Sequence, residues 1–175
     1  MPISSPLPDS VRAVRQPHRR WRQDDRRGLA RGGRRRGDEP PLAHFAGPKP
    51  TILIADVSED GRAMLAEYFA FLGCKVVEAA DGHEAFEKAP HCDVALLELG
   101  LPGMGGLAVA QRMRASAETA QKAVIVHTSW VTADARASVV AAGIPTFIPK
   151  PVDLTLLAAQ VLHAYQCSAS LQPVT

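Results

Sequence analysis

Four polar residues stand at or just after the ends of separate short apolar runs: Asp56, Glu98, Thr128 and Lys150. Carboxylates act as nucleophiles or hold cations, an ammonium pairs with an anion, and a hydroxyl donates or accepts a hydrogen bond. If the runs are neighbouring strands of one parallel sheet, their carboxyl ends place all four side chains at one edge. Function should therefore be sought in the loops at residues 56–58, 98–100, 128–130 and 149–151.

The elements that must position these side chains follow from the hydrophobic pattern. Five short apolar runs predict strands over Thr51–Ala55, Lys75–Ala79, Val94–Leu97, Ala123–His127 and Thr146–Ile148. Amphipathic stretches predict helices over Glu59–Leu72, His83–Ala89, Leu107–Ala115, Ala133–Ala141 and Leu154–Tyr165, with Ser58 and Asp153 as N-caps. Because strands buried on both faces alternate with helices, we expect an α/β fold: a doubly wound, five-stranded parallel sheet with helices on both faces.

The chain divides by composition. Residues 1–47 hold eleven Arg and five acidic residues and are rich in Pro and Gly, whereas residues 48–175 hold nine Lys or Arg and thirteen acidic residues. We expect a disordered arm over 1–48, a folded domain over 49–167 and a short tail over 168–175. Since about nine residues follow the last predicted helix, we expect no C-terminal output domain.

Several classes of protein are excluded or disfavoured. No apolar run approaches the roughly 18 residues that span a bilayer, and the N-terminus carries no secretory signal, so we expect a cytoplasmic protein without a membrane partner. The cysteines are Cys74, Cys92 and Cys167, an odd number with wide spacing, which predicts reduced, half-buried core thiols rather than disulfides or a zinc site. The arginine-rich arm suggests nucleic-acid binding, but it lacks interleaved aromatic residues and helical periodicity, so this hypothesis is disfavoured.

Five motifs in order resemble one known family. Residues 52–56 read Ile-Leu-Ile-Ala-Asp, 77–85 read Val-Glu-Ala-Ala-Asp-Gly-His-Glu-Ala, 96–104 read Leu-Leu-Glu-Leu-Gly-Leu-Pro-Gly-Met, 126–129 read Val-His-Thr-Ser, and 147–152 read Phe-Ile-Pro-Lys-Pro-Val. Over about residues 50–166 the chain resembles the CheY-like receiver domains of two-component response regulators. The resemblance implies the strand order 2-1-3-4-5 and a place in phosphorelay signal transduction, in which a histidine kinase phosphorylates an aspartate after the third strand.

The resemblance also implies roles for individual residues. Asp56 matches the first of two acids that hold Mg²⁺ with the acceptor aspartate, and Lys150 matches the lysine that pairs with the phosphoryl group. Thr128 matches the hydroxyl that senses the phosphoryl group, and Phe147 matches the switch aromatic. A cis peptide bond before Pro151 is implied as well.

Two positions depart from the family pattern. Val57 stands where the second acid is expected, and Glu98 stands where the phospho-acceptor aspartate is expected. With Asp56 as the residual ligand we expect no useful Mg²⁺ site and no other cofactor, since Glu59 and Asp60 belong to the first turn of a predicted helix. The longer Glu98 side chain places its carboxylate about 1.5 Å too far into the pocket, so we expect no phosphorylation. We also expect that the chain is not an enzyme, because we interpret it as a module that acts through protein–protein contact.

Two interpretations of Glu98 stay open at this point. Its carboxylate either imitates the phosphorylated state by engaging Lys150 and Thr128, or forms a buried ion pair with Lys150 that leaves the resting arrangement unchanged. We interpret the chain as a stand-alone pseudo-receiver that acts by protein–protein contact. Its expected partner is a histidine kinase or a downstream regulator, or a second copy bound through the fourth helix, fifth strand and fifth helix.

Other functions remain alternatives, and two further side chains need an assignment. A working phosphorelay receiver and a nucleic-acid binder stay open, whereas a flavodoxin-type enzyme is disfavoured because residues 57–62 lack a phosphate-binding turn.

His127 should face the side of the sheet opposite Thr128 and contribute to packing. Trp130 either packs against the domain or contacts a partner, and packing is favoured.

Overall fold

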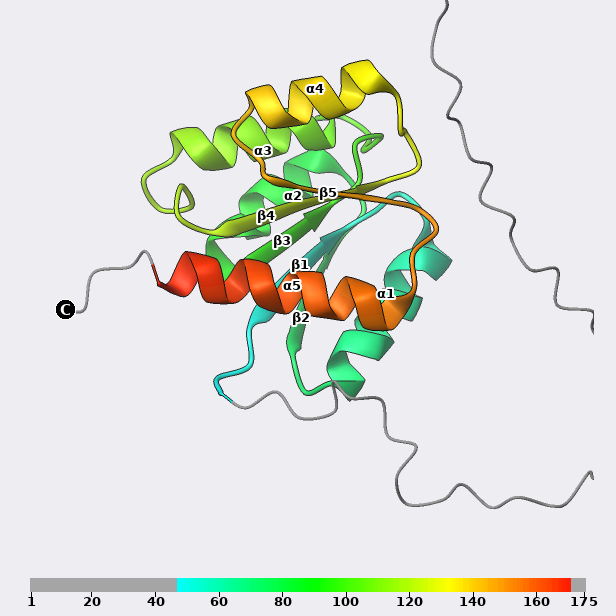
Figure 1. The fold of residues 1–175 in the computed structure, drawn as a ribbon, viewed down its shortest axis with the longest axis vertical. Coiled ribbons are helices and arrows are strands. Elements are labelled where there is room, and N and C mark those ends of the chain that lie inside the picture. The colour runs from blue at the N-terminus through cyan, green and yellow to red at the C-terminus, as the bar shows by residue number, and fades with distance from the viewer. Residues whose placement is uncertain (1–46, 171–175) are drawn as a thin grey trace, which may run out of the picture. The chain divides into compact units, whose positions relative to one another are not determined.

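A computed structural model describes residues 47–170, which form a five-stranded parallel sheet flanked by helices (Figure 1). The strands are β1 (Thr51–Ala55), β2 (Lys75–Ala79), β3 (Val94–Leu97), β4 (Ala123–Thr128) and β5 (Thr146–Pro149). Their order is β2-β1-β3-β4-β5, with every neighbouring pair parallel. The predicted fold class and strand order are confirmed, whereas the proposed arm over 1–48 lies almost wholly outside the described residues.

Helices cover both faces of the sheet. They are α1 (Glu59–Phe71), α2 (Gly82–Lys88), α3 (Gly106–Ala115), α4 (Ala133–Ala141) and α5 (Leu154–Ala169), and a 3₁₀ turn η1 (Ala89–His91) follows α2. Helices α1 and α5 pack on one face, and α2, α3 and α4 pack on the other (Figure 1). Within residues 47–170, no helix combines the length and the apolar character needed to cross a membrane.

The inner strands β1, β3 and β4 are mostly apolar because successive side chains enter two different cores, whereas the edge strand β2 exposes Lys75 and Glu78. In β1, Leu53 and Ala55 belong to the core that also contains residues of α2, α3 and α4, while Ile52 and Ile54 belong to the core that contains residues of α1 and α5. All four side chains are 0–1% exposed. A strand buried on both faces has no polar face to alternate with, which is why continuous apolar runs predicted these strands.

The predicted helix caps are confirmed. The Ser58 hydroxyl accepts a hydrogen bond from the Gly61 amide at 3.1 Å at the start of α1. The Asp153 carboxylate accepts hydrogen bonds from the amides of Thr155 and Leu156 at 2.9 and 3.1 Å at the start of α5. Each cap satisfies donors that the first helical turn leaves free, so it fixes where the loop after β1 or β5 ends.

Helix α5 is longer than predicted, and this corrects one cysteine assignment. It continues to Ala169 rather than ending at Tyr165, because residues 166–169 contain neither Pro nor Gly to stop it. Cys74 and Cys92 are core thiols as expected, although they are buried rather than half-buried, but Cys167 is exposed on the added turn of the helix. The prediction of a core thiol at Cys167 is therefore wrong.

The loops that follow β3 and β5 are shaped by special backbone positions. At Gly106 a Cβ atom would lie 2.0 Å from the Glu98 carbonyl oxygen, so only glycine lets α3 begin this close to the end of β3. Strand β5 is an edge of the sheet and ends at Pro149, which has no amide hydrogen to donate to a ladder. The Lys150–Pro151 peptide bond is cis, as the resemblance implied.

Candidate functional site

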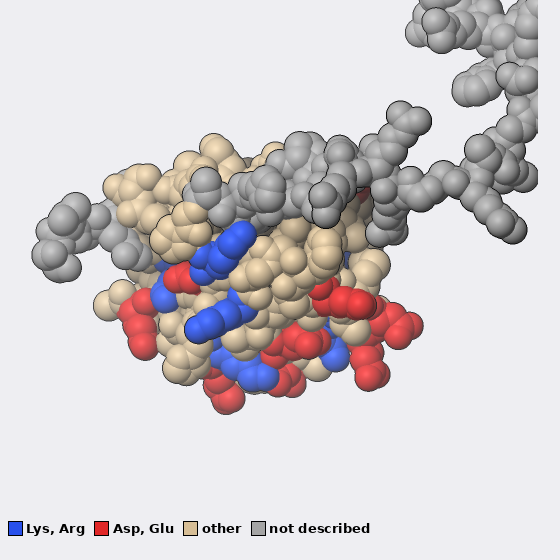
Figure 2. All heavy atoms as spheres, turned by 90° about the horizontal axis from the view of Figure 1, so that it is seen from below, with Lys and Arg blue, Asp and Glu red and all other residues tan. Residues whose placement is uncertain are grey.

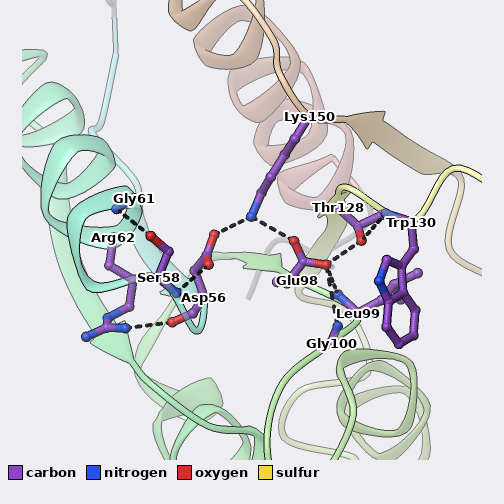
Figure 3. Close-up of polar contacts among 10 residues, drawn as sticks. All are labelled: Asp56, Ser58, Gly61, Arg62, Glu98, Leu99, Gly100, Thr128, Trp130 and Lys150. Atoms are coloured by element: carbon purple, nitrogen blue, oxygen red, sulfur yellow. Dashed lines mark hydrogen bonds and ion pairs between the residues drawn. The ribbon is translucent and has the colours of Figure 1, made fainter.

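Asp56, Glu98, Thr128 and Lys150 converge at the carboxyl edge of the sheet (Figure 3). Asp56 follows β1, Glu98 follows β3, Thr128 is the last residue of β4, and Lys150 follows β5. Asp56, Glu98 and Thr128 are 4%, 8% and 0% exposed. The polar groups that the sequence singled out thus share one buried pocket.

The Glu98 carboxylate is the centre of this pocket. Its Oε1 atom accepts hydrogen bonds from the Leu99 amide at 2.8 Å, from the Gly100 amide at 3.4 Å and from the Thr128 hydroxyl. Its Oε2 atom pairs with Lys150 Nζ at 2.7 Å. One carboxylate therefore binds a cation, a hydroxyl and two backbone amides.

Lys150 bridges the two carboxylates of the pocket. Besides Glu98, its ammonium donates to Oδ2 of Asp56. Oδ1 of Asp56 accepts a hydrogen bond from the Ser58 amide at 2.9 Å, and the Arg62 guanidinium donates to the Asp56 backbone oxygen at 2.7 Å. All four carboxylate oxygens of Asp56 and Glu98 are thus bound by donors of the chain itself.

The electrostatics of the pocket favour the ionised forms of Glu98 and Lys150. Burial by itself would raise the pKa of Glu98, but hydrogen bonds from Lys150 and Thr128 and the Lys150 charge outweigh it and lower that pKa. Burial by itself would lower the pKa of Lys150, but its bonds to Asp56 and Glu98 raise that pKa instead. Two carboxylates and one ammonium leave the pocket with a formal charge of −1 at neutral pH.

The Mg²⁺ ion that the fold family implies does not fit this donor set. Magnesium needs near-octahedral oxygen ligation, yet Val57 offers no oxygen and an ammonium already lies between the Asp56 and Glu98 carboxylates. Glu59 and Asp60 lie exposed in the first turn of α1. Among residues 47–170, no three Cys, His, Asp or Glu side chains are grouped so that they could hold a metal ion.

His127 lies directly beneath the pocket. Its ring is 6% exposed and lines a small void with Asp56, Glu98 and apolar residues that include Leu65 of α1. This places it on the opposite face of β4 from Thr128, as predicted. Its Nε2 atom finds no hydrogen-bond partner in the described part of the chain. Burial and the nearby Lys150 charge lower the pKa of His127 to about 4.

The predicted switch aromatic, Phe147, lies on β5, which β4 separates from β3, the strand that Glu98 follows. Phe147 is half-buried against the core under α2, α3 and α4. The Arg136 guanidinium of α4 lies over its ring, 4.4 Å from the ring centre. This cation–π contact joins α4 to the residue that would report the state of the pocket.

Three apolar side chains in the loops after β1 and β4 are exposed. Trp130 is 62% exposed, Val131 is 55% exposed and Val57 is 56% exposed. The Trp130 amide donates to the Thr128 hydroxyl oxygen at 3.1 Å, and its indole lies beside Gly100 (Figure 3). Packing was the favoured interpretation of Trp130, and it is wrong, because the loop after β4 carries the side chain outside both cores.

Some contacts of the site were not predicted from the sequence. The amides of Leu99 and Gly100 were missed because any residue supplies an amide, and only the turn geometry aims these two at Glu98. The second bond of Lys150, to Asp56, was missed as well. Arg62 carried a usable signal, since an arginine one helical turn into α1 can reach back to the end of β1.

Comparison with known proteins decides the family. The family model described as "Response regulator receiver domain" matches residues 52–162. The chain belongs to this family. As a receiver domain it is a signalling module of two-component systems, whose members interact with histidine kinases and downstream regulators.

Curated relatives match this receiver domain over part of their length. A "Cyclic di-GMP phosphodiesterase" of Thermotoga maritima is 34% identical over 114 residues, which are 65% of this chain and 30% of that protein. The "Transcriptional activator protein PfeR" of Pseudomonas aeruginosa is 28% identical over 120 residues, which are 67% of this chain and 38% of that protein. The receiver domain thus spans about a third of the length of these relatives.

Solved structures support the same fold. A CheY-like receiver domain protein from Methanospirillum hungatei superposes with a TM-score of 0.67 at 20% identity, covering 71% of this chain and all of that one. The "BeF3 Activated DrrB Receiver Domain" superposes with a TM-score of 0.61 at 18% identity, covering 68% of this chain and 99% of that one. At these identities the likeness concerns the fold of the receiver domain.

The surface charge of the receiver domain is mixed on the face seen in Figure 2. Over the described part of this face, Lys and Arg side chains are interspersed with Asp and Glu rather than gathered into a basic patch. A surface of this kind does not supply the continuous positive field with which proteins attract nucleic acid. The nucleic-acid hypothesis concerned the arm, which lies outside the described residues.

Proposed function

We propose that this receiver domain signals without being phosphorylated, and that Glu98 permanently takes the place of a phosphorylated aspartate. The observation that carries the proposal is the set of contacts of one carboxylate. Glu98 binds the ammonium of Lys150 and the hydroxyl of Thr128, which are the two groups that the family pattern assigns to the phosphoryl group. The two amides after β3 complete its ligation.

The alternative of an ion pair in a resting arrangement explains less of this geometry. A simple ion pair needs only the contact between Glu98 and Lys150. It gives no reason for Thr128, at the end of another strand, to donate to the same carboxylate. A carboxylate carries one charge and two oxygens where a phosphoryl group carries nearly two charges and three oxygens, so the imitation is partial.

The output of such a domain is protein–protein contact. Thr128 ends β4 and Phe147 lies on the neighbouring strand β5, where Arg136 of α4 covers its ring. The state of the pocket therefore reaches the surface formed by α4, β5 and α5. We propose that this surface binds a histidine kinase, a downstream regulator or a second copy of the chain.

Restoring the missing acids tests the proposal. The double substitution V57D/E98D supplies the second acid and an acceptor of family length, so it should take up phosphate from a small phosphodonor such as acetyl phosphate in the presence of Mg²⁺. The native chain should take up none. Intact-mass spectrometry and a phosphate-affinity gel measure the product.

The single variants are matched controls. E98D keeps Val57 and so lacks the second acid, while V57D keeps Glu98 and so lacks an acceptor of the right length. V57D should be labelled about 100-fold more slowly than the double variant, because its acceptor carboxylate is misplaced by at least about 1 Å. E98D should also be labelled far less than the double variant, because it lacks the second acid that holds Mg²⁺. A double variant that folds and accepts no phosphate would refute this explanation of the lost activity, as would native chain labelled at Glu98.

A further inference from the structure

The exposed face of α5 carries a second group of polar side chains, remote in sequence from the pocket. His163 and Cys167 are four positions apart in the sequence, so they lie on the same side of the helix one turn apart. Both are exposed, and Nε2 of His163 lies 3.8 Å from Sγ of Cys167. They line the wall of an open cleft of about 1070 Å³ beside β5.

The separation of these two atoms suits a shared metal ion. A tetrahedral zinc ion binds sulfur at about 2.3 Å and nitrogen at about 2.0 Å, which places two such ligands about 3.5 Å apart. The 3.8 Å observed needs only a small rotamer adjustment. Two ligands four residues apart on one helix face are also the arrangement by which helices commonly chelate zinc.

One chain supplies half of such a site. Structural zinc sites have four protein ligands, and no group of three or more metal-ligating side chains exists among residues 47–170. Helix α5 belongs to an outer face of the domain, so a twofold axis beside it would bring a second His163 and Cys167 opposite the first pair. The two copies together would supply two nitrogens and two sulfurs.

We propose that His163 and Cys167 of two chains bind one divalent transition-metal ion of the zinc class, and that this ion joins two copies through α5. Each Cys167 thiol loses its proton to solvent as its sulfur–metal bond forms, and each neutral His163 ring binds through the Nε2 lone pair. Two thiolates neutralise the two charges of the ion, and no electron transfer occurs. The inference does not depend on the proposed role of Glu98.

The test uses the full chain in a thiol-free reductant with Zn²⁺, Co²⁺ or a chelator. Zinc should convert the chelator-treated chain to a dimer, measured by light scattering after size exclusion, with one ion per two chains. Cobalt should give the sulfur-to-cobalt charge-transfer band and the intense visible bands of tetrahedral coordination. Both the dimer and the bands should disappear in C167S and in H163Q.

Two further variants serve as controls. H91Q removes an exposed histidine of η1 and should leave metal binding and dimerisation unchanged. H163C should keep the dimer and strengthen the charge-transfer band, because it replaces each nitrogen by a thiolate. A complex with one ion per chain that stays monomeric would overturn the proposal. So would a metal-dependent dimer that survives C167S, or a dimer that the reductant dissociates and the chelator does not.

Discussion

Replacing Glu98 with glutamine removes a charge from the pocket and keeps the shape of the side chain. The amide oxygen of the variant can still accept from Thr128 and from the backbone amides, but its NH₂ group would face the Lys150 ammonium, which now lies 2.7 Å from a carboxylate oxygen. A hydrogen bond to a charged group contributes about 1.5–3 kcal/mol. Because Lys150 keeps its bond to Asp56, we expect E98Q to lower the free energy of unfolding by about 2 kcal/mol at neutral pH.

The matched variant K150M should lower the free energy of unfolding more than E98Q does. It removes the cation that bridges two carboxylates, Asp56 and Glu98, which are only 4% and 8% exposed. Leaving buried charges without their partner typically costs about 3–5 kcal/mol. The predicted order of stability at neutral pH is therefore native, then E98Q, then K150M, measured by urea unfolding followed by far-UV circular dichroism.

The stability difference between the native chain and E98Q should depend on pH in a definite direction. The pKa of Glu98 is lowered in the folded state, so its contribution to stability is fully present above its ordinary value of 4.5 and is lost as pH falls through the folded pKa. The gap between native and E98Q should therefore close in acid. An E98Q variant as stable as the native chain at neutral pH, or a gap that acid leaves unchanged, would refute the assignment of Glu98 as an ionised, multiply bound acceptor.

Three further predictions follow from other contacts. The free energy of unfolding of the native chain should fall by about 3 kcal/mol through His127 as pH falls from 6.5 to about 4, because the buried neutral ring resists protonation and the same ring in the unfolded chain does not. H127L should abolish this pH-dependent loss, measured by urea titrations at each pH. G106A should lower the free energy of unfolding by more than about 2 kcal/mol in the same assay, because the added Cβ atom would lie 2.0 Å from a backbone oxygen. G100A should be tolerated, because the nearest atom to its added Cβ is a Trp130 ring carbon at 3.8 Å. R136A should lower the free energy of unfolding by about 0.5–1 kcal/mol, since it removes the cation that covers the Phe147 ring. The same variant should increase exchange broadening of the Phe147 ring signals in NMR spectra.

The fold was predictable because its signals are local. The bounds of β1, β2 and β3 are those that the sequence predicts, and β1 and β3, which are buried on both faces, end where polar or turn residues begin. The end of α5 was less predictable. Its last turn lies beyond the apolar pattern of the helix and depends only on the absence of a Pro or Gly to stop it.

The site was predictable in its members and less so in its contacts. Family motifs brought Asp56, Glu98, Thr128 and Lys150 to one edge, and the structure places them within bonding distance of one another. That Lys150 would bridge both carboxylates depends on side-chain rotamers, which no motif specifies. The exposure of Trp130 depends on the path of the loop after β4, which is equally invisible in the sequence.

The most direct test of the account is a titration of the isotopically labelled native chain with Mg²⁺ and then with the phosphate analogue beryllofluoride, following the amide signals of Thr128 and Lys150 by NMR. If Glu98 already takes the place of the phosphoryl group, neither addition should shift these signals, whereas the same additions should shift them saturably in V57D/E98D. A saturable shift of both amides in the native chain would contradict the account, because it would mean that the pocket still accepts the cation and the phosphoryl group.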